Sequence, residues 1–186
     1  THHPAMRHVA EIRRQLKTRT IFNLLGPLTN PANVKHHLIG VYARDWLDPM
    51  AKVLHQLGSK TAWLTHGQDG MDEITTTAAT DAVELRDGKF ERFLLEPEMA
   101  GLPRARPEAL KGGEAEHNAT ELKRLLQGQH GTYRDIVMLN AGAALVVAGQ
   151  ADDVKHGVAL AAAALDSGRA RRTLEKLIAV TNGASS

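Results

Sequence analysis

The chain has 186 residues, 42% of them hydrophobic and 24% charged, which is ordinary for a single globular domain. The formal net charge is only +2, so the pI near 9.0 gives little reason to expect a nucleic-acid partner. Because there is no cysteine, a disulfide framework and a cysteine-ligated metal are excluded, and no apolar run reaches membrane-spanning length. We find no signal peptide and therefore expect a cytoplasmic protein.

The first segment, residues 4–16, predicts a helix because apolar residues recur there at helical spacing. Arg13 lies near this apolar stripe. Its guanidinium can bind a carboxylate through two hydrogen bonds, or its aliphatic stem can simply cover the core. The residues alone favour the second interpretation.

The next stretch, residues 19–32, reads RTIFNLLGPLTNPA. Residues 20–25 can form a short helix, and we expect Gly26 and Pro27 to end it. The proline ring disfavours a helical conformation at the preceding residue and supplies no amide donor. On the residues alone, a buried connection between two helices is the simplest interpretation.

A βαβ unit is predicted next, with strands at residues 37–42 and 61–65 and a helix at 46–57 between them. Asp45 is placed to cap this helix, and Gly58 to end it. Such a unit implies a parallel strand pair with a right-handed crossover. Ligands bind beyond the carboxyl ends of parallel strands, where the loop with Asp72 and Glu73 should lie.

The rest of the chain predicts a hairpin and then helices. Residues 82–85 and 89–94 flank Asp87-Gly88, a dipeptide that favours a tight two-residue turn. The predicted helices span residues 114–126, 133–148, 153–166 and 170–180. We expect Asn118 and Asn140 to lie near helix starts, where capping is the simplest interpretation.

Asp72 and Glu73 are the strongest candidates for chemistry. Adjacent carboxylates repel one another, and a divalent cation relieves that repulsion. Mg²⁺ suits a few carboxylates together with phosphate oxygens, although a solvated acidic turn is the commoner structure. His2, His3 and His8 do not have the spacing of a metal site. We find no glycine-rich phosphate-binding motif, since Gly112-Gly113 does not follow a predicted strand.

Several motifs together resemble the anthranilate phosphoribosyltransferase family. Besides residues 19–32, they are HHPAMRHV at 2–9, IRRQL at 12–16, GQDGMDEI at 67–74, LKGGEAEHNA at 110–119 and LNAGAAL at 139–145. They occur in the family's order. The resemblance implies an α/β fold, with a central mostly parallel sheet flanked by helices, like the nucleoside phosphorylase and phosphoribosyltransferase catalytic domain. Residues 1–186 would be the C-terminal part of that domain, without the family's N-terminal helical domain and glycine-rich loop.

The resemblance also implies a reaction, in which the 5-phosphoribosyl group moves from phosphoribosyl diphosphate to anthranilate and diphosphate is released, in tryptophan biosynthesis. Asp72 and Glu73 would hold Mg²⁺, while Arg13, His3 and Pro27 would bind anthranilate. No residue is expected to act as an essential general base. The family forms homodimers through its N-terminal region, and residues 1–186 alone are expected to be inactive. No membrane or nucleic-acid partner is expected.

Two alternatives remain open. One is a pyrimidine-nucleoside phosphorylase of the same broad fold, whose motifs we do not recognise here and which Arg13 and the GPLTNP sequence argue against. The other is a transferase-like paralogue that binds nucleic acid and lacks this activity. It would have a basic groove and other residues in place of Arg13 and Pro27, yet these and the two acids match the family.

Overall fold

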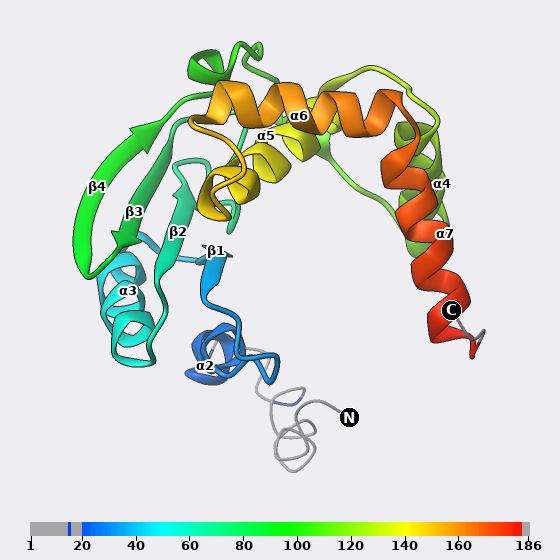
Figure 1. Cartoon of the computed structure of the whole chain (residues 1–186). Helices are drawn as coiled ribbons and strands as arrows, with labels where there is room; N and C mark the ends of the chain where they lie inside the picture. The colour runs from blue at the N-terminus through cyan, green and yellow to red at the C-terminus, as the bar shows by residue number, and fades with distance from the viewer. Residues whose placement is uncertain (1–14, 16–19, 184–186) are drawn as a thin grey trace.

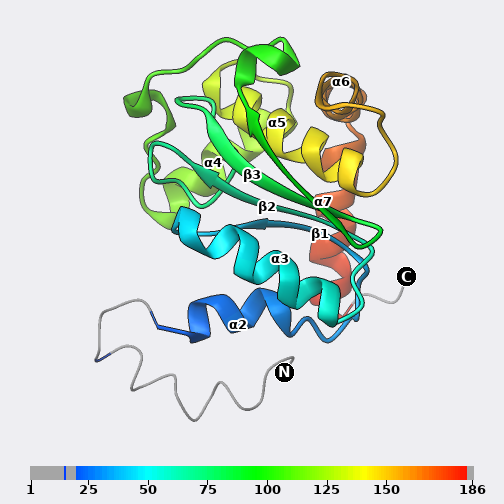
Figure 2. The same ribbon diagram turned by 90° about the vertical axis from the view of Figure 1, so that its left-hand side faces the viewer.

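The computed structural model describes residue 15 and residues 20–183. It shows an α/β fold with a four-stranded sheet in the order β1-β2-β3-β4. The strands are β1 (His36–Gly40), β2 (Thr61–Gly67), β3 (Thr80–Arg86) and β4 (Lys89–Leu95). Helices cover both faces, with α2 (Phe22–Leu28) and α3 (Leu47–Gln56) on one side and α5 (Thr132–Val147) and α6 (Val154–Asp166) on the other (Figures 1 and 2). The predicted α/β class is therefore confirmed.

The sheet is mixed. β1 and β2 are parallel and joined by α3, which confirms the predicted βαβ unit. The pairs β2–β3 and β3–β4 are antiparallel, so the expectation of a mostly parallel sheet holds only for β1–β2 in the described part of the chain. A parallel pair needs a crossover connection, usually a helix, and loop 68–79 and the hairpin turn provide none.

The predicted hairpin is confirmed between β3 and β4. Its two connecting residues, Asp87 and Gly88, have φ angles of 49° and 79°. Positive φ at both positions matches the turn to the right-handed twist of the strands, and aspartate and glycine tolerate it better than most residues. The hairpin forms the end of the sheet farthest from β1.

The sheet separates two apolar cores. On one face, Ile39, Leu64 and Leu85 pack with the buried residues of α3. On the other face, Trp63 and Leu95 join a cluster that includes buried residues of α5 and α6. Because successive residues of a strand point to opposite faces, β2 is buried on both sides and contributes to both cores.

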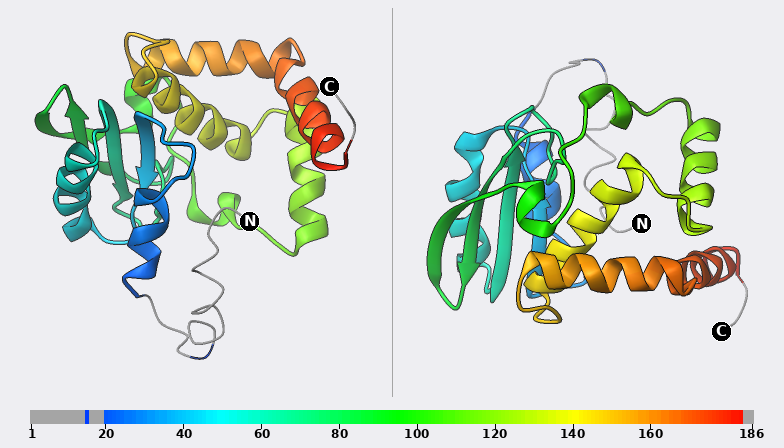
Figure 3. Two further views of the ribbon diagram at one scale, coloured as in Figure 1. Left: turned by 60° about the horizontal axis from the view of Figure 1, so that its bottom comes forward. Right: turned by 90° about the horizontal axis from the view of Figure 1, so that it is seen from above.

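The four C-terminal helices lie close to their predicted bounds: α4 (Ala115–Leu126), α5, α6 and α7 (Arg169–Thr181). Helices α4 and α7 lie beyond α5 and α6, away from the sheet (Figures 1 and 3). None of the described residues of α7 is buried. Among the described residues, no helix combines the length and the apolar character needed to cross a bilayer.

Two local predictions were wrong. Helix α2 runs through Pro27 to Leu28 instead of ending at Gly26. Gly26 has no Cβ to clash with the proline ring, and the carbonyl that loses its amide partner belongs to Asn23, an exposed residue whose carbonyl water can solvate. Asp45 lies inside the 3-10 helix Arg44–Trp46, so Trp46 is the N-cap of α3. The helix predicted at residues 4–16 lies, apart from residue 15, outside the described residues.

Helices α5 and α6 touch through two glycines. A Cβ on Gly157 would lie 2.3 Å from the carbonyl oxygen of Gly142, and a Cβ on Gly142 would lie 2.7 Å from the amide nitrogen of Val158. Both clashes involve backbone atoms of a packed helix, which cannot rotate aside as a side chain can. The helices therefore approach one another as closely as they do because both positions lack a side chain.

We predict that Gly157→Ala destabilises the protein. Alanine favours a helix over glycine by about 1 kcal/mol, but overpacking at such a contact costs about 1–3 kcal/mol. Urea unfolding should therefore show a net loss in the free energy of unfolding. Ala159→Gly, at an exposed position of α6, is the control and should cost only the propensity difference. A Gly157→Ala protein more stable than the wild type would show that the helices can separate freely.

Candidate functional site

The candidate site lies at the carboxyl ends of β1 and β2. Loop 68–79, which leaves β2, carries Asp72 and Glu73, and both acids are exposed. The loop crosses the end of β1 at Gly40, where a Cβ would lie 1.5 Å from the carbonyl oxygen of Asp72. Only glycine leaves room for this crossing. The predicted position of the acidic pair, at the carboxyl edge of the βαβ unit, is therefore confirmed.

Asp69 organises the loop on both sides of the acids, through Met71 before them and Thr75 and Thr77 after them. One of its carboxylate oxygens accepts a hydrogen bond from the Met71 amide at 3.1 Å, and the other accepts from the Thr75 hydroxyl at 2.7 Å and from the Thr77 hydroxyl. Burial acts to raise the pKa of Asp69, but these hydrogen bonds outweigh it, and the pKa lies below its ordinary value. Asp69 is thus an ionised acid that serves the shape of the loop.

The second half of the loop is anchored in the core. Ile74, Thr75 and Thr76 are fully buried. The Ile74 amide donates to Asn140 Oδ1 at 3.1 Å, and Asn140 Nδ2 donates to the Ile74 carbonyl at 2.7 Å. The exposed acids therefore lie in a segment that the Asp69 hydrogen bonds close and that Ile74 anchors to Asn140 of α5.

The capping role predicted for Asn118 and Asn140 was wrong for both. Helix α5 begins after Gly131, so Asn140 lies in its interior, where its amide reaches the loop instead of its own first turn. Helix α4 begins after Glu114. The Asn118 side chain, one turn further along, accepts from the Gly113 amide at 2.9 Å and donates to the Gly113 carbonyl at 2.7 Å.

His66 is a further residue that the sequence did not single out. It lies in β2 next to the loop, is partly buried, and its Nδ1 lies 2.8 Å from the Val41 carbonyl oxygen. The Val41 amide in turn donates to the Thr65 carbonyl at 2.8 Å. These two bonds hold Val41, the residue that follows β1, against β2. The carboxyl ends of the two strands, where the acids lie, are therefore joined to one another.

The charge of the loop suits a cation. Although Glu73 is exposed overall, partial desolvation of its carboxyl raises its pKa, and the negative charges of Asp72 and Asp69 raise it further. A bound cation would relieve that repulsion. No group of three or more His, Cys, Asp or Glu residues among the described ones could hold a metal by itself. Asp72 and Glu73 therefore fit Mg²⁺ that also takes oxygen ligands from water or a phosphate group.

The other predicted site residues are placed less completely. Pro27 is partly buried in α2, a helix that packs against α3. Arg13 and His3 lie outside the described residues. The structure thus places Asp72 and Glu73 at the end of β1, while the grouping of Arg13, His3 and Pro27 remains a prediction.

Comparison with known proteins supports the resemblance. A family model described as "Glycosyl transferase family, a/b domain" matches residues 1–171. Anthranilate phosphoribosyltransferase of Rhodopseudomonas palustris (strain HaA2) is 55% identical over 184 residues, which are 99% of this chain and 54% of that protein. The same enzyme of Parvibaculum lavamentivorans is 56% identical over 182 residues, 98% of this chain and 53% of that protein.

Solved structures agree with the sequences. The crystal structure of anthranilate phosphoribosyltransferase from Thermus thermophilus has a TM-score of 0.86 at 47% identity, covering 95% of this chain and 52% of that one. The Saccharomyces cerevisiae enzyme in complex with PRPP and Mg has a TM-score of 0.82 at 27% identity, covering 91% and 49%. The chain spans about half the length of the curated relatives it matches. Because the family model covers residues 1–171, this chain belongs to the glycosyl transferase family, within its a/b domain.

Proposed function

We propose that this chain carries the metal-binding loop of an anthranilate phosphoribosyltransferase. The reaction moves the 5-phosphoribosyl group from phosphoribosyl diphosphate to the amine of anthranilate and releases diphosphate, as a step of tryptophan biosynthesis. The observation that carries the proposal is the fixed Asp72–Glu73 pair at the carboxyl edge of β1 and β2. Relatives about 55% identical to the chain are named for this activity.

Asp72 and Glu73 would hold Mg²⁺, which when bound supplies positive charge to the leaving diphosphate. Two carboxylates are too few for a tight all-protein Mg²⁺ site, so the ion should bind together with phosphoribosyl diphosphate. Support comes from the raised pKa of Glu73, caused by burial and then by its acidic neighbours. A yeast relative has been solved with PRPP and Mg.

Arg13, His3 and Pro27 would bind the acceptor. The planar guanidinium of Arg13 suits the carboxylate of anthranilate, which it would orient so that the amine faces the ribose. A yeast relative has been solved in complex with 4-fluoroanthranilate. We assign no general base. The displacement mainly requires that the acceptor amine be positioned against the ribose and that the charge of the leaving diphosphate be neutralised.

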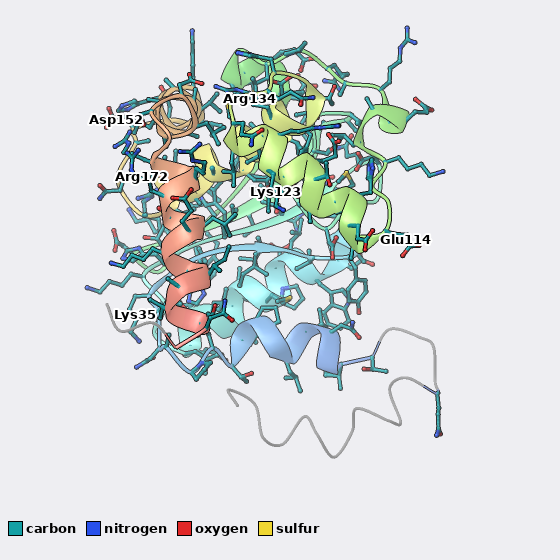
Figure 4. All side chains as sticks on the ribbon, turned by 90° about the vertical axis from the view of Figure 1, so that its right-hand side faces the viewer. Lys35, Glu114, Lys123, Arg134, Asp152 and Arg172 are labelled. Atoms are coloured by element: carbon teal, nitrogen blue, oxygen red, sulfur yellow. The ribbon has the colours of Figure 1, made fainter. Side chains whose placement is uncertain are left out.

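A polypeptide corresponding to the other half of the relatives would complete the enzyme. Among the described strands β1 pairs with β2 alone, so the β1 edge of the sheet is free to pair with a further strand. Helices α4 to α7 line an apolar groove of about 820 Å³, which α4 and α7 flank in Figure 4. We propose that an N-terminal region with a helical domain and a glycine-rich loop covers these surfaces and forms the homodimer, in the cytoplasm. Residues 1–186 alone would then be inactive.

The two alternative functions gain no support from the relatives compared above. Those relatives are named for anthranilate phosphoribosyl transfer, and none of those names refers to a nucleoside phosphorylase or to nucleic acid. Asp72, Glu73 and Pro27 are the residues that the family resemblance implies, and the first two occupy one loop at the sheet edge. The transferase is therefore the function that we propose.

We predict that the Asp72→Asn/Glu73→Gln variant loses Mg²⁺-dependent activity. The test uses the completed enzyme, meaning residues 1–186 assembled with the N-terminal half of a relative. Turnover should fall about 100-fold or more because the diphosphate loses its counter-charge. Calorimetry should show no Mg²⁺ binding in the presence of phosphoribosyl diphosphate. Asp152→Asn, at an exposed acid before α6, is the control. Unchanged turnover in the double variant would refute the proposal.

We also predict that Arg13→Ala in the completed enzyme mainly weakens the use of anthranilate. Losing a charged partner for a carboxylate should cost roughly 2–5 kcal/mol in kcat/KM if the pair is desolvated. The KM for phosphoribosyl diphosphate should change far less. Steady-state kinetics with each substrate varied in turn provide the measurement. A loss that falls on phosphoribosyl diphosphate instead would place Arg13 outside the acceptor pocket.

A further inference from the structure

We infer that Asn140 is a positioning residue, which holds the Asp72–Glu73 loop at the height and orientation that Mg²⁺ binding requires. This inference rests on the proposed function for the role of the acids, but the contact itself stands on geometry. Asn140 lies in the interior of α5 and is separated from Ile74 by 66 residues. Ile74 directly follows Glu73.

The contact is a paired one. Asn140 Oδ1 accepts from the Ile74 amide at 3.1 Å, and Nδ2 donates to the Ile74 carbonyl at 2.7 Å. The same Nδ2 group also donates to the Ile136 carbonyl, one turn back in α5, at 3.0 Å. The side chain thus binds both polar groups of one loop residue while it is held by its own helix. Asparagine is the shortest side chain that carries a donor and an acceptor on two separate atoms, as this paired contact requires.

The surroundings make the contact rigid. Leu139 and Ala143 on the same helix are fully buried, and so is the side chain of Ile74. A partly buried amide in such a setting is costly unless its donors and acceptor are paired, so the bonded arrangement is strongly preferred over an open one. Helix α5 packs against β1 and β2. The bonds from Asn140 therefore fix the Ile74 backbone relative to these two strands, at whose carboxyl ends the acids lie.

The partners of Asn140 are the backbone amide and carbonyl of Ile74, which no substitution can make apolar, so the side chain also stabilises the fold by pairing them. What an amide adds is a defined backbone position next to Glu73. The Gly40 crossing fixes the peptide between the two acids, and the Asp69 hydrogen bonds join Met71 before the acids to Thr75 after them. Without Asn140 these contacts remain, but the Ile74 backbone next to Glu73 loses its own anchor to α5, and the carboxylates would sample more orientations.

The test is Asn140→Ser. Serine in a helix can donate back to the carbonyl four residues earlier, so the bond to Ile136 is replaced while the paired bonds to Ile74 are lost. Asn118→Ser is the matched control, because Asn118 makes the same two-bond contact with a different loop, at Gly113. Asn140→Ala is a second variant that removes every side-chain hydrogen bond.

Two readouts are measured. Hydrogen exchange in residues 1–186 should show faster exchange of the Ile74 amide in Asn140→Ser but not in Asn118→Ser. In the completed enzyme, Asn140→Ser should raise the Mg²⁺ concentration for half-maximal turnover about 10-fold, the usual effect of losing a residue that orients a metal ligand. The KM for anthranilate should stay within about two-fold, whereas a general loss of folding would lower the apparent kcat without raising the Mg²⁺ requirement.

The outcomes separate this inference from the proposed function. The role of Asn140 is overturned if Asn140→Ser leaves the exchange of the Ile74 amide unchanged. It is also overturned if Asn140→Ser leaves the Mg²⁺ requirement unchanged while Asp72→Asn/Glu73→Gln abolishes turnover. Neither result contradicts the proposed function. Full Mg²⁺-dependent turnover in Asp72→Asn/Glu73→Gln overturns the function, and the positioning role with it. Should Asn140→Ser not fold, Asn140→Ala at low temperature gives the same two measurements.

Discussion

The site depends on one steric constraint, the absence of a side chain at the end of β1. The carbonyl of Asp72 occupies the space that a Cβ on Gly40 would take. No rotation of a neighbouring side chain can relieve a backbone clash of this kind. The acidic loop can therefore lie across the strand end only because residue 40 is glycine, and its acids project from the carboxyl edge as a result.

The loop is then fixed by polar contacts of two kinds. Asp69 binds groups within six to eight residues in sequence and so shapes the loop locally. Asn140 binds across 66 residues and ties the loop to a core helix. The first contact gives the loop its shape, and the second sets its position relative to the sheet. A pair of adjacent carboxylates, which repel one another, stays exposed and ordered because its neighbours on both sides are held.

The sequence predicted what local patterns and general chain rules determine. The Asp87-Gly88 turn, the bounds of α4 to α7 and the βαβ unit follow from short-range signals, and the βαβ rule placed Asp72 and Glu73 at the correct edge. It could not reveal the contact of Asn140 with Ile74, because nothing in a helical pattern shows that an interior amide pairs with a distant loop. Asp69 did carry a signal, since aspartate before glycine favours a bond to the backbone two residues on. Pro27 misled because the preceding glycine removes the usual clash.

We have proposed that Asp72 and Glu73 hold a divalent cation together with the diphosphate substrate. Anomalous scattering of Mn²⁺ in crystals of the completed enzyme, grown with phosphoribosyl diphosphate, would locate this cation. We expect a peak within about 2–2.5 Å of a carboxylate oxygen of each acid, with diphosphate oxygens as further ligands. A well-occupied Mn²⁺ peak on the diphosphate that touches neither Asp72 nor Glu73 would contradict it.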